Sequence, residues 1–344
     1  MRRGQIARVC LPHMKYHKMR IHISWTFFWR KQLYWHFKRG VIETQMKKKV
    51  YSASVTPLTA DGDLDVNGLA SVFERNIRHG IDGIMILGSM GEWSQFSGAF
   101  RDRLIAESVK AVRGRIDLLV GITAPTTDGA VANLRRASAQ DFDSYVFMLP
   151  KASEVADPVR DICAVLDAAD RPVYYYHCPP NNGIALSLAQ FETVMRHPRL
   201  KGIKNSASNM WLRRELILLR RGMSQMPALL EGQEWAADEA LLVGYDGMLC
   251  GIGALGSKLM VCLARAVDAG DAAEAVRVQN RLIELFHGVY GQGLETVWAG
   301  QKYALKCLGL CVSEQTLAQS VDVLTDRRKR EIETCVEAFR EELD

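Results

Sequence analysis

One lysine in the sequence occupies a position where an amine can do covalent chemistry. Lys204 follows Leu200, Gly202 and Ile203 in a short apolar run that predicts a strand pointing into a folded core. Partial desolvation there disfavours the ammonium form and lowers the pKa of the lysine. A neutral amine can attack a ketone and form an imine, which then acts as an electron sink. From position alone, a lysine that reaches solvent or pairs with a carboxylate is the alternative.

A tyrosine lies at the matching place one strand earlier. Tyr176 precedes Lys204 by 28 residues, a spacing typical of one strand–helix repeat, so both side chains can meet at the same end of a sheet. A phenol beside an imine can transfer the protons of carbinolamine formation and of carbon–carbon bond cleavage. The alternative is that residues 174–176 are ordinary strand aromatics, packed alternately inward and outward.

A third element is the short loop that runs from Gly88 to Glu92. Its two glycines, Gly88 and Gly91, let the backbone approach a ligand closely. The Ser89 hydroxyl and the loop N–H groups, including that of Met90, can hold a carboxylate. A plain tight turn explains the same residues, and we interpret Glu92 as a buried structural acid that accepts loop N–H bonds.

The elements that must position these residues alternate along the chain from residue 50 onward. Short apolar runs are followed by segments with helical spacing. Such near-continuous apolar runs are typical of parallel strands covered by helices on both faces. The predicted strands are residues 51–58, 83–88, 117–123, 144–150, 172–178, 200–206, 227–232 and 247–253.

Helical spacing fills the intervals, for example at 66–79, 128–138, 156–168 and 209–221. Eight such units predict a (β/α)8 TIM barrel over residues 46–268. A doubly wound open sheet is the alternative, but it would need a glycine-rich phosphate turn after its first strand. Residues 269–344 contain no strand pattern and predict an all-helical extension of two or three helices, two of them at 272–290 and 326–343.

Taken together, the quoted residues resemble the dihydrodipicolinate synthase / N-acetylneuraminate lyase family over residues 48–341. The loop from Gly88 to Glu92 resembles the family's G-[ST]-x-G-E segment, Tyr176 its strand-five tyrosine, and Lys204 the lysine of its G-x-K motif. Gly232 and the 247–251 loop follow in family order. The resemblance implies a class I aldolase that forms a Schiff base between pyruvate and Lys204, without metal or organic cofactor, in a homotetramer or homodimer.

Two departures bear on the substrate that the resemblance implies. Family members that make dihydrodipicolinate carry an arginine shortly after the strand-five tyrosine, where this chain has Asn181. They also carry a tyrosine pair after strand four, where this chain has Lys151-Ala152-Ser153. The loop at 88–96 is more similar to the branch that cleaves 2-keto-3-deoxy sugar acids.

We therefore expect a lyase that reversibly cleaves a 2-keto-3-deoxy sugar acid, or another 4-hydroxy-2-keto acid, to pyruvate and an aldehyde. Three alternatives remain: a 4-hydroxy-tetrahydrodipicolinate synthase, a keto-acid sugar dehydratase that uses the same imine, and a regulatory barrel that only binds a keto acid. The expected catalytic residues are Lys204, Tyr176 and Ser89, and the expected substrate-binding residues are Ser89, Met90, Gly232, Leu249, Gly251 and Asn181.

The net charge of +5 is unevenly distributed. Residues 1–45 carry ten Lys or Arg against one acid, so the remainder is mildly acidic and does not predict nucleic-acid binding. For residues 1–45 three interpretations stay open: a start codon placed upstream of a true start at Met46, a targeting or membrane-surface extension, and a disordered arm.

The eight cysteines are dispersed, and none forms a C-x-x-C pair. Such cysteines are typical of reduced, buried thiols, and no metal site is expected. No stretch of about 18 apolar residues without charge is present, so we expect no membrane span. A cytoplasmic location follows as an expectation.

Overall fold

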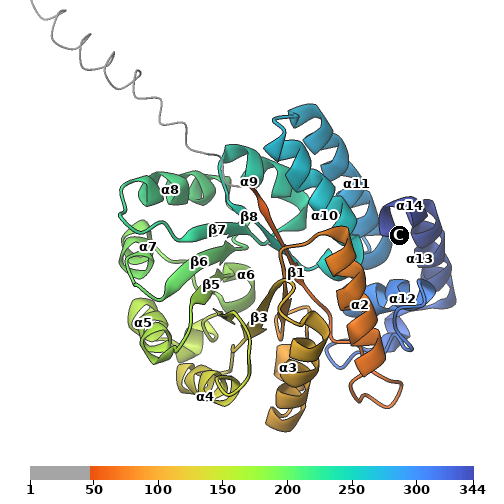
Figure 1. Ribbon diagram of the computed structural model, residues 1–344, viewed down its shortest axis with the longest axis horizontal. Helices are drawn as coiled ribbons and strands as arrows, with labels where there is room; N and C mark the ends of the chain where they lie inside the picture. The colour runs from red at the N-terminus through yellow and green to blue at the C-terminus, as the bar shows by residue number, and fades with distance from the viewer. Residues whose placement is uncertain (1–46) are drawn as a thin grey trace, which may run out of the picture. The chain divides into compact units, whose positions relative to one another are not determined.

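The computed structural model describes residues 47–344 (Figure 1). Met46–Asp344 form one compact unit, so the boundary predicted near residue 268 separates two parts of a single unit. The interpretations of residues 1–45 lie outside the described residues.

Eight parallel strands close into a barrel in the order in which they occur in the chain. Seven of the predicted apolar runs contain one strand each, and the run at 51–58 overlaps the first strand, which confirms the TIM-barrel prediction. The strands are β1 (Lys49–Ala53), β2 (Gly83–Ile86), β3 (Asp117–Gly121), β4 (Ser144–Phe147), β5 (Val173–His177), β6 (Leu200–Asn205), β7 (Ala228–Glu231) and β8 (Gly247–Cys250).

The observed strands are mostly shorter at their carboxyl ends than the apolar runs. In β2 the ladder ends at Ile86 because Leu87 adopts a left-handed backbone conformation with φ of 54°. That conformation is incompatible with a continuing strand. The residues after each strand are therefore free to form the loops at the barrel mouth.

Alternate residues of each strand serve two different cores. Tyr51, Met85, Leu119 and Val146 belong to a cluster inside the barrel. Their strand neighbours belong to the larger cluster between the strands and the surrounding helices. Side chains alternate across a strand, so one face of each strand packs in each cluster. Both faces are buried, and the apolar runs are therefore continuous.

Helices surround the barrel (Figure 1). Most begin at a Ser, Thr, Asp or Asn whose side chain accepts a hydrogen bond from a first-turn N–H, which stabilises the helix start. They are α2 (Val66–His79), α3 (Gly98–Val112), α4 (Thr127–Ala137), α5 (Pro158–Ala168), α6 (Pro179–Asn182), α7 (Leu188–Met195), α8 (Met210–Arg221), α9 (Ala237–Val243) and α10 (Gly253–Asp268). Short 3-10 turns lie at η1 (Trp93–Gln95), η2 (Ala152–Glu154), η3 (Glu234–Ala236) and η4 (Val321–Val323).

The C-terminal extension is all-helical, as predicted, but has four helices among the described residues instead of two or three. They are α11 (Ala272–Tyr290), α12 (Val297–Cys307), α13 (Asp326–Ala338) and α14 (Arg340–Leu343). The predicted helix at 326–343 is interrupted because Phe339 leaves helical geometry between α13 and α14. Helices α12–α14 gather on one side of the barrel beside α2 and α11 (Figure 1).

Buried contacts join this extension to the barrel. The guanidinium of Arg75, on α2, donates to the carbonyl oxygens of Leu343 and Leu255, each at 2.8 Å. A buried guanidinium needs several acceptors to offset its lost hydration. Within residues 47–344, no helix has the length and apolar character that crossing a membrane requires.

Candidate active site

A cavity of about 330 Å³ opens at the carboxyl ends of the strands. This is the end of a (β/α)8 barrel at which catalytic residues normally lie. All but one of the predicted site residues line the cavity: Ser89, Met90, Tyr176, Asn181, Lys204, Gly232 and Gly251. The strand ends and loops thus bring together residues that are up to 162 positions apart in the chain.

Leu249 is the exception. It is fully buried in the apolar cluster inside the barrel and does not line the cavity. It points inward from β8, but it precedes the strand's last residue, Cys250, and so lies below the cavity floor. Sequence order alone does not fix how far along a strand the cavity begins.

Lys204 and Tyr176 are neighbours on adjacent strands, because the register of β5 and β6 pairs them directly. The Lys204 Nζ lies 4.2 Å from the centroid of the Tyr176 ring. The two residues are only 5% and 7% exposed. Their side chains therefore form one buried amine–phenol pair at the cavity.

Burial shifts both groups of this pair toward their neutral forms. It lowers the pKa of Lys204 from its ordinary value of 10.5, although the nearby Cys250 and Glu234 act in the opposite direction. Burial also raises the pKa of Tyr176 well above its ordinary value, and the side chains of Cys178 and Ser206 lie beside the phenol. The arrangement supplies an amine that is readily deprotonated next to a phenol that keeps its proton.

The 88–92 loop approaches the cavity in a conformation that depends on Gly91. A Cβ at this position would lie 2.9 Å from Leu87 N and 3.2 Å from Ser54 O, so a larger residue would displace backbone. The loop is held from both sides: Thr56 Oγ1 donates to Gly91 O at 2.9 Å, and Trp298 Nε1 donates to Ser89 O at 3.0 Å.

The Ser89 side chain faces the residue that departs from the dihydrodipicolinate-forming pattern. Asn181 Nδ2 lies 3.5 Å from Ser89 Oγ. Asn181 is positioned by α6, a single helical turn after β5 that ends at Gly183 with a left-handed φ of 78°. The two polar side chains thus form one edge of the cavity.

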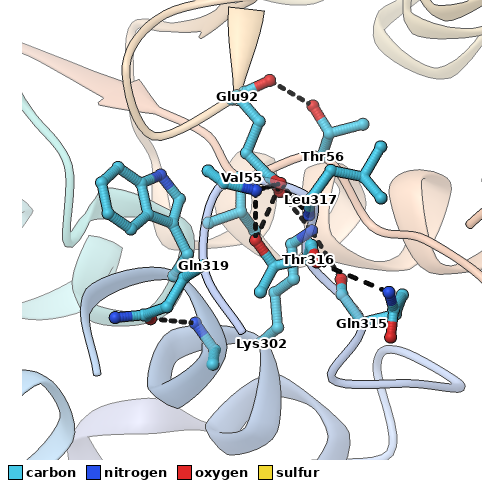
Figure 2. Close-up of polar contacts among 12 residues, drawn as sticks. Val55, Thr56, Glu92, Lys302, Gln315, Thr316, Leu317 and Gln319 are labelled. Atoms are coloured by element: carbon cyan, nitrogen blue, oxygen red, sulfur yellow. Dashed lines mark hydrogen bonds and ion pairs between the residues drawn. The ribbon is translucent and has the colours of Figure 1, made fainter. Parts of the chain in front are cut away.

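Glu92 is a buried structural acid, as interpreted from the sequence, but its partners come from the C-terminal extension (Figure 2). It forms an ion pair with Lys302 of α12, and both side chains are fully buried. Its Oε2 accepts hydrogen bonds from Thr316 Oγ1 at 2.7 Å, Leu317 N at 2.6 Å and Ala318 N at 2.9 Å. These contacts attach the site loop to a segment more than 200 residues away.

Gly232 is required by close packing around the lysine. A Cβ at residue 232 would lie 2.1 Å from Ser206 Oγ and 2.9 Å from Lys204 Cε. The preceding residue, Glu231, accepts from Gly232 N at 3.1 Å and pairs with the buried Arg213 at 2.9 Å. The loop after β7 is therefore fixed directly against the Lys204 side chain.

Glu234 places a carboxyl group in the cavity wall. Its Oε1 accepts from Gly251 N and, at 3.0 Å, from Ile252 N, which joins the loops after β7 and β8. Burial raises the pKa of Glu234, and Lys204 and the backbone donors oppose that shift.

Several residues of the cavity wall were not predicted from the sequence. Ser206 follows Lys204 by two residues, so strand alternation is the signal that points to it. Trp235, Phe286, Tyr290, Leu294 and Val297 have no comparable signal, since the last four come from the C-terminal extension.

Comparison with known proteins decides the family. Residues 46–339 match the sequence model of the Dihydrodipicolinate synthetase family. The chain belongs to this family. Membership fits the barrel and the buried lysine, and it makes the protein a lyase of the pyruvate-dependent class I aldolase type.

Relatives in the family carry two different activities in their names. The chain is 29% identical over 280 residues to the Escherichia coli (strain K12) protein named probable 2-dehydro-3-deoxy-D-pentonate aldolase YjhH, covering 78% of this chain and 91% of that protein. It is 26% identical over 272 residues to a 4-hydroxy-tetrahydrodipicolinate synthase of Gluconacetobacter diazotrophicus, covering 78% and 90%.

Solved structures of the family share the fold. YagE, a prophage protein of the dihydrodipicolinic acid synthase family from E. coli K12, superposes with a TM-score of 0.76 at 24% identity, covering 85% of this chain and 98% of that one. Dihydrodipicolinate synthase from Aquifex aeolicus gives a TM-score of 0.77 at 19% identity, covering 86% and 99%.

Proposed function

We propose that this family member reversibly cleaves a 2-keto-3-deoxy sugar acid, or a related 4-hydroxy-2-keto acid, to pyruvate and an aldehyde. The observation that carries the proposal is the buried Lys204 amine, 4.2 Å from the Tyr176 ring centroid at the cavity. A buried amine with a lowered pKa beside a protonated phenol is the pairing that imine chemistry needs.

The reaction begins when the neutral amine of Lys204 attacks the ketone carbon of the substrate. Tyr176 donates a proton to the departing hydroxyl, so that one water leaves and the imine forms. The C4 hydroxyl then gives its proton to the Tyr176 phenolate, the C3–C4 bond breaks, and its electron pair moves onto the imine to give an enamine and the aldehyde. Protonation of the enamine at C3 and addition of water release pyruvate and regenerate the amine.

The substrate carboxylate is proposed to lie at the 88–92 loop. Ser89, which carries a hydroxyl, and Met90, which carries a backbone N–H, both line the cavity. Loop N–H groups suit an anion because several donors converge without a side-chain charge. Ser89 also relays protons toward Tyr176 in this proposal. Asn181, Gly232 and Gly251 line the aldehyde end, and Leu249 supports that end from below.

A second candidate, the 4-hydroxy-tetrahydrodipicolinate synthase reaction, is favoured by the names of several relatives. Its aldehyde partner carries an additional carboxylate. The neutral Asn181 stands where the resemblance implies an arginine, and Lys151 directs its ammonium to the Asn181 carbonyl oxygen. Because no guanidinium occupies that position, we rank the sugar-acid aldolase first.

Product analysis tests the proposal against its alternatives. The protein is incubated with 2-keto-3-deoxy pentonate and hexonate, and pyruvate is measured with a coupled dehydrogenase while mass spectrometry follows the remaining acid. We expect equimolar pyruvate and aldehyde. A product that has lost water but kept its carbon chain would instead identify a dehydratase. Turnover of pyruvate with aspartate semialdehyde alone would identify the synthase. Pyruvate binding without any turnover would identify a regulatory barrel.

The proposal also covers the oligomeric state, the cellular location and the binding partners of the enzyme. We propose a homotetramer or homodimer in the cytoplasm that binds small keto acids and aldehydes, without nucleic-acid or membrane partners. Support comes from the seven described cysteines, which are all free thiols as in reducing compartments. Size-exclusion chromatography with light scattering measures the oligomeric state.

A further inference from the structure

Tyr290, the last residue of α11, lines the active-site cavity although it lies outside the barrel. Its side chain is only 2% exposed. Within residues 47–344 its hydroxyl has no hydrogen-bond partner. A buried hydroxyl without a partner is costly, so a native protein that keeps one at a cavity wall has a use for it.

The Tyr290 ring is held in place, so its hydroxyl has a defined position. It packs edge-to-face against Phe286, one helical turn earlier, with ring centroids 4.6 Å apart. The helix ends immediately afterwards at Gly291, which has a left-handed φ of 82°. Burial raises the pKa of Tyr290 well above its ordinary value, so the phenol keeps its proton and can donate it to a hydrogen bond.

The packing of its ring places Tyr290 beside the loop after β7, because Phe286, which contacts Tyr290, also packs edge-to-face on Trp235 with ring centroids 5.4 Å apart. Glu234 and Cys250 are the groups that influence Tyr290 electrostatically, and both also influence Lys204. Tyr290 therefore lies on the β7–β8 side of the cavity, where Gly232 and Gly251 are proposed to line the aldehyde end. An atom bound there belongs to the half of the substrate that leaves as the aldehyde.

Glu234 limits the kind of substrate group that can bind beside Tyr290. Its Oε1 is used by Gly251 N and Ile252 N, which leaves Oε2 for another donor. A substrate carboxylate beside Glu234 would be repelled, and an apolar group would leave Glu234 Oε2 and the Tyr290 hydroxyl without partners. A hydroxyl accepts from the Tyr290 phenol and donates to a carboxylate, so it satisfies both.

We propose that Tyr290 is a specificity-determining residue that binds a hydroxyl group of the aldehyde half, so that the enzyme prefers hydroxylated aldehydes over unsubstituted aliphatic ones. This inference rests on the proposed function. It makes the C-terminal extension part of the active site, in addition to its support of the 88–92 loop.

The test uses the native full-length protein and Tyr290→Phe, which removes only the hydroxyl. Condensation of pyruvate is measured with glyceraldehyde and with propanal, its analogue without hydroxyls. We expect kcat/KM for glyceraldehyde to exceed that for propanal in the native protein and to fall about tenfold in Tyr290→Phe, with propanal unchanged.

Tyr175→Phe is the matched control. Its hydroxyl is likewise buried and without a partner among residues 47–344, but it packs in the core outside the barrel and not at the cavity. It should leave the ratio of the two aldehydes unchanged.

A native protein with no preference for glyceraldehyde, or equal changes for both aldehydes in Tyr290→Phe, would overturn the inference. Borohydride trapping of the pyruvate imine, followed in every variant, separates this failure from a failure of the proposed function. Trapping that persists while the aldehyde preference is absent would contradict only the role of Tyr290.

Discussion

Burial lowers the pKa of the Lys204 amine and so makes it available as a nucleophile. Lys204 loses hydration at the cavity floor, and no positive side chain is needed to lower its pKa. The phenol of Tyr176 is affected in the opposite direction by the same burial. One physical cause therefore produces a nucleophile and a proton donor on adjacent strands.

A pH profile of imine formation tests whether the pKa of Lys204 is lowered. The rate of imine formation with pyruvate should rise with pH and reach a plateau below 10.5, because the folded amine loses its proton more easily than a free lysine. Glu234→Gln should move the inflection lower still, since the Glu234 charge favours the ammonium. In Glu239→Gln, which changes a half-exposed carboxylate paired with Arg213, the inflection should stay in place. An inflection at or above 10.5 in the native protein would contradict this account.

Tyr176→Phe tests the proton donor. We expect kcat for cleavage to fall about 10²- to 10⁴-fold, the usual contribution of a positioned acid–base group. Slow imine formation should persist, because Lys204 is intact. Tyr174→Phe changes a neighbouring buried phenol that does not line the cavity, and it should retain most activity. Equal losses in the two variants would argue for a packing role of Tyr176.

At the scale of elements, the site combines two kinds of support. The strands place Lys204 and Tyr176 through register and alternation, and Gly232, directly after β7, donates to Asn205 O at 2.9 Å. The 88–92 loop has no such ladder, and it depends on partners from α12 and from residues 315–318. Contacts with the C-terminal extension thus fix the position of this loop, as hydrogen bonds to neighbouring strands fix the position of a strand.

The Glu92–Lys302 pair should be sensitive to the loss of one partner. Glu92→Gln leaves the Lys302 ammonium fully buried without its counter-charge, and should lower the free energy of unfolding by about 3–5 kcal/mol. The double change Glu92→Gln with Lys302→Met should recover part of this loss. Urea denaturation measures both effects.

Glu331→Gln, which alters an exposed ion pair on α13, is the control and should have no measurable effect. If Glu92→Gln were equally neutral, the buried pair would not hold the loop as described. In a protein that stays folded, the KM for pyruvate should also rise, because the displaced loop carries Ser89.

At the scale of the whole molecule, the alternation of apolar runs made the barrel predictable. Every predicted run overlaps a strand, and the repeat between Tyr176 and Lys204 correctly indicated neighbours. The sequence pattern is sufficient for the strands and for this pair of neighbours, because they depend only on local alternation and on the consecutive order of the strands.

The rest of the site depends on packing between distant elements. Tyr290 and Lys302 reach the site from helices whose contact faces no local pattern assigns. Leu249 shows the same limit within a strand: alternation predicts that it points inward, but the depth of the cavity is set by how all eight strands are staggered.

Acid should destabilise the whole fold partly through His177. Its ring is buried against Phe191, and burial lowers its pKa from 6.5 to about 4. Between these values the unfolded chain binds a proton that the folded chain does not, so stability is lost as the pH falls from 6.5 toward 4. The expected loss is about 3 kcal/mol.

His177→Gln should remove that part of the pH dependence of the free energy of unfolding. His197→Gln, which changes a histidine paired with Asp167 near the surface, serves as the control. Identical pH slopes for native protein and His177→Gln would contradict the assignment.

Residues 1–45 are expected to contribute nothing to catalysis, because the alternating pattern begins only at Val50. A chain that begins at Met46 should match the full chain in cleavage rate and melting temperature. Lower activity of the shorter chain would assign a role to the extension.

The central claim is tested most directly by trapping the imine. The protein is incubated with pyruvate, reduced with borohydride and digested, and the modified peptide is identified by mass spectrometry, with Lys204→Arg as the control. We predict a reduced pyruvate adduct on Lys204 in the native protein and none in the variant. A folded protein that gives no adduct on Lys204, or gives it on Lys201 of the same strand, would contradict the account.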